Sequence, residues 1–81
     1  MAEYDVRMLS CCLRSCLRPP TYMIHVGQSS ILLLCEPCAG LWSYAYRAPL
    51  LTLGETLDVA DAFLPVKRGK AIVGFQQQAP T

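Results

Sequence analysis

Two close pairs of cysteines constrain this chain more than any other feature of its sequence. Cys12 and Cys16 form the first pair, Cys35 and Cys38 form the second, and 18 residues separate the pairs. Four thiolates that converge tetrahedrally on one ion are a common ligand set for structural zinc. The separation is the length of one hairpin, so the sequence predicts a hairpin between the pairs and one structural Zn²⁺ where they meet.

Length and composition make such a metal important for folding. The chain has 81 residues, enough for one domain, and domains of this size commonly depend on a metal, on disulfides or on a partner. Apolar residues make up 53% of the sequence and charged residues only 16%, compared with about 25% charged in ordinary soluble domains. We therefore expect part of the apolar surface to stay exposed until a partner or a second copy of the chain covers it.

A fifth cysteine, Cys11, lies directly beside the first pair. Five cysteines leave one thiol over in any set of disulfides, and in a reducing compartment close cysteine pairs serve metals or redox exchange. A four-cysteine zinc site leaves either Cys11 or Cys12 as the spare thiol. Disulfides and a redox-active cysteine pair remain as alternatives to the zinc site.

The charge and the N-terminal sequence bear on location and partners. The first five residues are acidic where a signal peptide would be basic, and no apolar run reaches the length of a membrane span. We expect an intracellular, cytoplasmic protein with no membrane partner. The net charge is +1, and binding of zinc by four thiolates would change it to about −1, which argues against a general phosphate binder.

The central part of the chain predicts a hairpin followed by a helix. Pro19 and Pro20 force an extended path, and aromatic and β-branched residues at 21–26 are followed by a turn at 27–30 and an apolar run at 31–34. Pro37 then suits the first turn of a helix that should run to about Arg47 and end before Pro49.

The C-terminal half predicts a second helix and a short strand. Thr52 and Glu55 have the spacing of a capping box, and a stripe formed by Leu57, Ala60 and Leu64 follows and ends at Pro65. We expect residues 70–75 to form an edge strand that either pairs with the N-terminal segment or adds to the sheet of a partner. We expect a single zinc-binding domain over residues 1–75 and a flexible tail over 76–81.

The order of a cysteine turn, a hairpin and a helix that opens with two more cysteines resembles the treble-clef zinc fingers. The resemblance covers about residues 11–48, and its most specific part is the sequence Leu34-Cys35-Glu36-Pro37-Cys38-Ala39. It implies a small α+β zinc-stabilised domain in which Cys12 and Cys16 lie on a knuckle and Cys35 and Cys38 at the helix N-terminus. The first pair departs from the usual family pattern because three residues separate its cysteines instead of two.

Other residues are assigned by the face they should occupy. On a strand, His25 lies opposite Tyr22, Ile24 and Val26, so we expect it to point outward and not to bind the metal. On the helix, one face should lie against the hairpin. Its members are Cys38, Leu41, Trp42 and Ala45.

A site with four cysteine ligands has no open position for water, and the sequence carries no other catalytic motif, so we expect no enzyme. The leading hypothesis is an interaction module, such as an adaptor, regulator or inhibitor, that docks on a larger protein assembly through Trp42 and Phe63. One alternative is a nucleic-acid-binding finger acting in transcription or RNA metabolism. Its contacts would come from Arg14, Arg18, Lys67, Arg68 and Lys70. A third hypothesis is a redox sensor built on Cys11 and Cys12.

Overall fold

The middle of the chain forms the predicted hairpin. The computed structural model describes residues 2–13, 15–27, 29–54, 56–59 and 63–78. Strands β2 (Tyr22–Val26) and β3 (Ser30–Leu34) pair antiparallel, with Tyr22 opposite Leu34 and Val26 opposite Ser30. Gly27 lies in the turn with φ 65°, a conformation that glycine adopts without steric cost. The hairpin prediction is confirmed.

The hairpin leads directly into helix α1 (Glu36–Tyr46), as predicted. Cys35 is the N-cap residue with an extended backbone, and Pro37 lies in the first turn, where its missing N–H removes no helical hydrogen bond. At the other end, Arg47 adopts a left-handed conformation, and the N–H groups of Arg47 and Ala48 donate to the carbonyls of Tyr44 and Ser43. This is a Schellman termination, and it ends the helix before Pro49.

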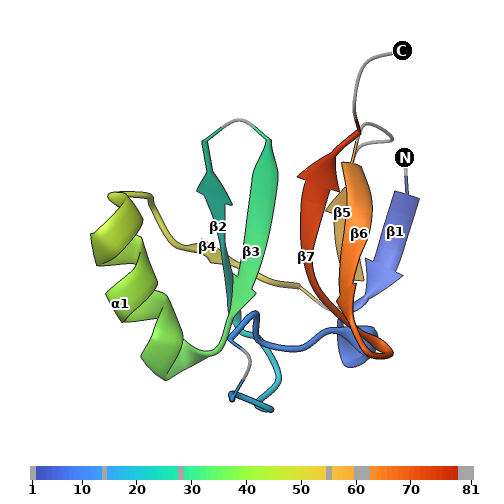
Figure 1. Ribbon diagram of the computed structural model, residues 1–81, viewed down its shortest axis with the longest axis horizontal. Coiled ribbons are helices and arrows are strands. Elements are labelled where there is room, and N and C mark those ends of the chain that lie inside the picture. Colours follow the sequence, from blue (N-terminus) through green and yellow to red (C-terminus); the bar gives the residue numbers. More distant parts are fainter. Residues whose placement is uncertain (1, 14, 28, 55, 60–62, 79–81) are drawn as a thin grey trace.

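The hairpin is part of a five-stranded antiparallel sheet with strand order β4-β2-β3-β7-β6. The additional strands are β4 (Leu51–Thr52), β6 (Phe63–Arg68) and β7 (Ala71–Gln77). Strand β1 (Ala2–Asp5), followed by the short 3₁₀ helix η1 (Val6–Met8), pairs with β5 (Thr56–Val59) in a separate two-stranded sheet. Figure 1 shows α1 beside β2 at one end of the molecule, with β6, β5 and β1 at the other.

The predicted second helix is wrong. Residues 56–59 form β5 and residues 63–68 form β6, while Glu55 and residues 60–62 lie outside the described part of the chain. Leu57 is buried opposite Tyr4 of β1, whereas Leu64 is exposed opposite Gln76 of β7, so the two leucines do not share a helical face. Among the described residues, α1 is the only α-helix.

The C-terminal strand exists but occupies a different place in the sheet. Strand β7 is central, between β3 and β6, and the edge position belongs to β6. The N-terminal segment approaches it through a parallel bridge between Leu9 and Ile72 and through a hydrogen bond of 2.9 Å from the Ser10 N–H to the Ile72 carbonyl. Strand β7 also continues through Gln77, so the predicted boundary of the tail at residue 76 is too early.

The apolar residues form two clusters on opposite sides of the β2–β3 hairpin. We call the first the sheet core. It consists of Leu9, Ile31, Leu33, Leu57, Ile72 and Phe75. We call the second the cysteine core. It consists of Cys11, Ile24, Leu34, Cys35 and Ala39. Strand β3 contributes to both clusters, which explains why its sequence is a continuous apolar run.

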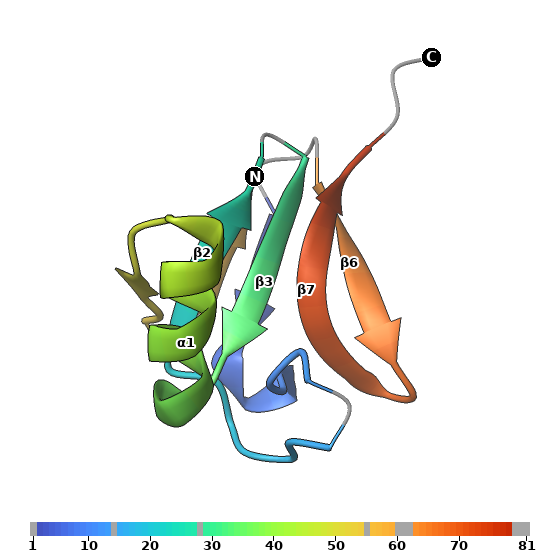
Figure 2. The same cartoon turned by 60° about the vertical axis from the view of Figure 1, so that its left-hand side comes forward.

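Helix α1 covers the cysteine-core side of the hairpin, as Figure 2 shows. Ala39 is fully buried and Trp42 packs against the cysteine core, but Leu41 and Ala45 are exposed. The predicted face of Cys38, Leu41, Trp42 and Ala45 is therefore only partly correct, because the true contact face is rotated by about one residue. No helix within the described ranges is both long and apolar enough to cross a membrane.

Candidate metal centre

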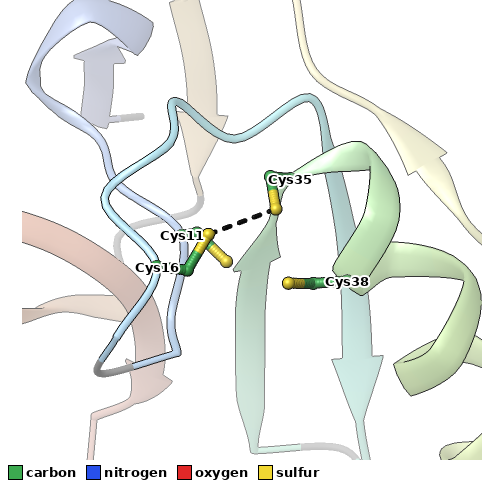
Figure 3. Close-up of side chains that lie close together, drawn as sticks. All are labelled: Cys11, Cys16, Cys35 and Cys38. Carbon is green, nitrogen blue, oxygen red and sulfur yellow. Dashed lines mark hydrogen bonds between the residues drawn. The ribbon is translucent and has the colours of Figure 1, made fainter.

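Four cysteine side chains converge at the junction of the hairpin, the helix and the N-terminal loop. The Sγ atoms of Cys11, Cys16, Cys35 and Cys38 all lie within 4.8 Å of one another. The Sγ atoms of Cys16 and Cys35 are 3.3 Å apart. Figure 3 shows Cys35 and Cys38 reaching the cluster from the start of α1, and Cys11 and Cys16 reaching it from the loop.

The start of α1 positions the second pair. Cys35 follows β3 directly as the helix N-cap, and Cys38 lies three residues later in the first turn. Residues three apart project from neighbouring positions on a helix, so both thiols face the same point. The free N–H groups and the positive end of the helix dipole at this terminus favour thiolates over thiols.

Backbone hydrogen bonds position the first pair. The Cys11 N–H donates to the Arg18 carbonyl at 3.2 Å, and the Cys12 N–H donates to the Leu33 carbonyl of β3 at 2.7 Å. The Cys16 N–H donates to the Leu13 carbonyl at 3.0 Å, which closes a tight turn. These contacts attach the loop to the end of the hairpin and bring Cys11 and Cys16 over the helix start.

The thiols differ in how readily they ionise. Burial opposes ionisation of Cys35, but hydrogen bonds from the backbone N–H and the thiol of Cys38, and from the thiols of Cys16 and Cys11, lower the pKa of Cys35 to about 7. The hydrogen bond to Cys35, together with burial, raises the pKa of Cys38 to about 12. The Cys35 thiolate therefore forms readily, and the Cys38 thiol resists ionisation unless a cation at the centre compensates its charge.

The arrangement fits one tetrahedral metal ion. A zinc ion with Zn–S bonds of about 2.3 Å places its four sulfurs about 3.8 Å apart. The separation of 3.3 Å between Cys16 and Cys35 and the upper limit of 4.8 Å for all four sulfurs lie on either side of that value. The four cysteines are thus positioned to hold one metal ion, and an all-thiolate donor set favours soft or borderline metals such as zinc.

The sequence analysis predicted three of these four cysteines as ligands. Cys16, Cys35 and Cys38 are in the cluster, but Cys11 takes the place that the sequence analysis assigned to Cys12. The Cys11 side chain is fully buried in the cysteine core, whereas Cys12 is partly exposed and only packs against that core. His25 is exposed on β2, as its place on the strand predicts, and it is not among the four clustered residues.

The two residues predicted to contact a partner lie outside the cysteine cluster. Trp42 and Phe63 are both partly buried, Trp42 against the cysteine core and Phe63 against the sheet core. Trp42 also stacks near Tyr46, with ring centroids 5.5 Å apart. Much of each aromatic surface is therefore used inside the protein, and a role in partner binding stays a prediction.

One of the five predicted nucleic-acid contacts, Arg68, is engaged in contacts within the protein. Arg18, Lys67 and Lys70 are exposed, and Arg14 lies outside the described part of the chain. Arg68 is partly buried and donates hydrogen bonds to backbone carbonyls of the cysteine loop. Sequence reasoning missed this contact, since no local pattern connects the last residue of β6 with a loop more than 50 positions earlier.

Comparison of the chain with protein-family models, with curated proteins and with solved structures gave no match.

Proposed function

We propose that this protein is a zinc-stabilised protein-interaction module in which one structural Zn²⁺ is bound by the four clustered cysteines. The observation that carries the proposal is the convergence of four sulfurs within 4.8 Å of one another. Four thiolates fill a tetrahedral site and leave no position for a water or a substrate. The metal therefore stabilises the fold, and we propose no catalytic role for it.

We further propose that the centre is of the treble-clef type. Supporting this, the loop with Cys11 and Cys16 precedes a β-hairpin, and the hairpin leads into a helix that begins with Cys35 and Cys38. Four residues separate Cys11 from Cys16, so the first turn is longer than the usual knuckle of that superfamily.

The outward side of α1 is the best-supported surface for a protein partner. Leu41 and Tyr44 are 67% and 85% exposed, and they lie on the side of the helix opposite Ala39. Large apolar side chains that a small domain leaves exposed together are typical of interaction sites. We call Leu41 and Tyr44 the outer helix face and propose it, in addition to Trp42 and Phe63, as a site of partner contact.

The two alternatives have weaker support. A nucleic-acid site would have to use Arg18, Lys67 and Lys70, because the guanidinium of Arg68 is already bonded within the protein. A redox sensor would use the spare thiol of Cys12, but burial and the neighbouring Cys11 raise the pKa of Cys12 to about 11. Few thiolates would therefore be available there for oxidation at neutral pH.

Two measurements test the proposal. Elemental analysis of the purified protein should give one zinc per chain, and a value well below one would contradict the metal centre. Partner capture should then be compared between the wild-type protein and a Leu41→Ser, Tyr44→Ser variant, with Leu64→Ser, Val66→Ser as a matched control.

The control removes two exposed apolar side chains from β6, where Leu64 and Val66 are 50% and 38% exposed. We expect partners captured by the wild type to be retained by the control and lost by the outer-helix variant. Equal capture by all three zinc-loaded proteins would remove the outer helix face from the proposal. Binding to nucleic acid that falls steeply with salt would support the nucleic-acid alternative instead.

A further inference from the structure

Arg68 occupies an unusual position for an arginine on a sheet edge. It is the last residue of β6, directly before the turn at Gly69, where φ is 64°. Along β6, partly buried Phe63 and Pro65 alternate with exposed Leu64 and Val66. Alternation alone would turn Lys67 inward, but the register of β6 against β7 shifts between Val66 and Lys67, and Arg68 is the partly buried residue instead.

The guanidinium of Arg68 is bonded to four carbonyls of the cysteine loop. Its Nη2 donates to the carbonyls of Cys11 and Cys16, each at 3.1 Å. Its Nη1 donates to the carbonyl of Cys12 at 3.3 Å and to that of Leu13. Each terminal nitrogen of a guanidinium carries two hydrogens in a fixed plane, so four donors are matched by four acceptors.

These carbonyls belong to the segment that supplies half of the metal centre. Cys11 and Cys16 are the two cluster residues that do not come from the start of α1, so their thiols depend on the loop for their position. Backbone contacts fix the loop to β3 on one side, through the Cys12 N–H and the Leu33 carbonyl. On the other side, Arg68 bonds the carbonyl groups of the same loop to the end of β6.

We propose that Arg68 is the positioning residue of the metal centre: its planar guanidinium holds the loop so that the Cys11 and Cys16 thiolates meet those of Cys35 and Cys38. This inference rests on the proposed zinc site and goes beyond it by assigning a residue that binds no metal. The positive charge is a second contribution, because four thiolates and one Zn²⁺ carry a net charge of −2. Groups that orient metal ligands typically affect metal affinity by about 10- to 100-fold.

The test compares Arg68→Lys and Arg68→Met with the neighbouring variant Lys67→Met, all in the full chain. Arg68→Lys keeps the charge but replaces the planar fork by a single nitrogen, and Lys67→Met removes an exposed charge from the preceding residue. The first readout is the rate of zinc transfer to an excess of a colorimetric chelator. We expect both Arg68 variants to release zinc about 10-fold faster or more, and Lys67→Met to match the wild type.

A second readout separates positioning from a general loss of stability. The zinc-loaded proteins are alkylated in pulses, and the modified cysteines are mapped by mass spectrometry. If Arg68 holds the loop, Cys11 and Cys16 become alkylated before Cys35 and Cys38 in the Arg68 variants. If Arg68 acts on the whole fold, all four cysteines become accessible together, and the proposal is overturned.

The remaining outcomes are also decisive. Zinc release and alkylation in Arg68→Lys that equal those of Lys67→Met overturn the role of Arg68 while leaving the metal centre in place. If the wild-type protein binds no zinc, the metal centre and the inference both fail. Failure of both Arg68 variants to fold with zinc also overturns the inference, since the residue would then support the entire domain and not the loop.

Discussion

Cys11 and Cys12 are adjacent in the chain and have different environments. The Cys11 thiol lies in the cluster and its side chain is fully buried, while Cys12 uses its N–H to bind β3 and keeps its side chain partly exposed. The two adjacent side chains thus lie in different places, and of the two thiols only that of Cys11 is part of the cluster. The backbone bond from Cys12 to Leu33 selects which one it is.

This difference predicts opposite results for two serine substitutions. Cys11→Ser removes one of the four clustered sulfurs, so it should lose tight metal binding, whereas Cys12→Ser should bind one metal ion as the wild type does. Cobalt substitution measures this directly, because the intensity of the thiolate-to-cobalt absorption reports how many sulfurs bind the ion. A full four-sulfur spectrum for Cys11→Ser, or its loss in Cys12→Ser, would show that the assignment is reversed.

The metal centre could be predicted from the sequence only up to this choice. Cys35 and Cys38 could be predicted as ligands because Pro37 indicates that a helix begins there. Cys16 could be predicted because no other cysteine lies next to it. Cys11 and Cys12 have the same chemistry and the same local sequence. What distinguishes them is the hydrogen bond from the Cys12 N–H to the carbonyl of Leu33 in β3, a residue 21 positions later in the chain.

At the scale of elements, the close approach of β3 and β7 depends on a glycine. Gly74 is buried and lies opposite Leu32, and a Cβ atom at this position would be only 2.5 Å from the carbonyl oxygen of Ile31. That oxygen belongs to the backbone of a central strand, so it cannot move aside as a flexible side chain would. The sheet therefore requires glycine at this position.

Gly74→Ala should accordingly lower the free energy of unfolding of the zinc-loaded protein by about 1 to 3 kcal/mol, the usual cost of overpacking a core. Gly40→Ala is the matched control, because Gly40 is exposed within α1 and a Cβ atom there meets nothing within 4 Å. Alanine favours the helix by about 0.5 to 1 kcal/mol, so this variant should be more stable than the wild type. Denaturant midpoints at saturating zinc measure both, and a Gly74→Ala midpoint equal to the wild type would contradict the close approach.

Elements defined by neighbouring residues were predicted well, and elements defined by distant pairing were not. The β2–β3 hairpin and α1 follow from the turn, the apolar runs and the prolines within them. Strand β5 instead owes its conformation to β1, more than 50 residues earlier in the chain, where Leu57 lies opposite Tyr4. The apolar stripe at helical spacing and the capping pattern at Thr52 predicted a helix here. The pairing with β1 leaves no local pattern in the sequence, so it could not be predicted.

At the scale of the whole molecule, the two cores differ in what holds them together. The sheet core consists of large hydrocarbon and aromatic side chains, with Tyr4 packed near Phe75 at a centroid distance of 5.0 Å. The cysteine core contains two thiols of the metal centre and the small side chain of Ala39. Metal–sulfur bonds would connect the helix start and the cysteine loop across this core, so the attachment of α1 and of the cysteine loop should depend on the metal much more than the sheet does.

Removal of the metal should therefore destabilise some segments of the protein more than others. Helix α1 has 11 residues, and isolated helices shorter than about 12 to 15 residues are marginal in water, so without the metal it should fray. After treatment with a chelator, hydrogen exchange followed by mass spectrometry should show lost protection over α1 and the cysteine loop, with protection retained over β6 and β7. Addition of zinc in excess over the chelator is the control and should restore the original pattern. Protection of α1 that survives full removal of zinc would show that the metal does not hold the helix, and equal loss over every segment would show that the two cores unfold as one unit.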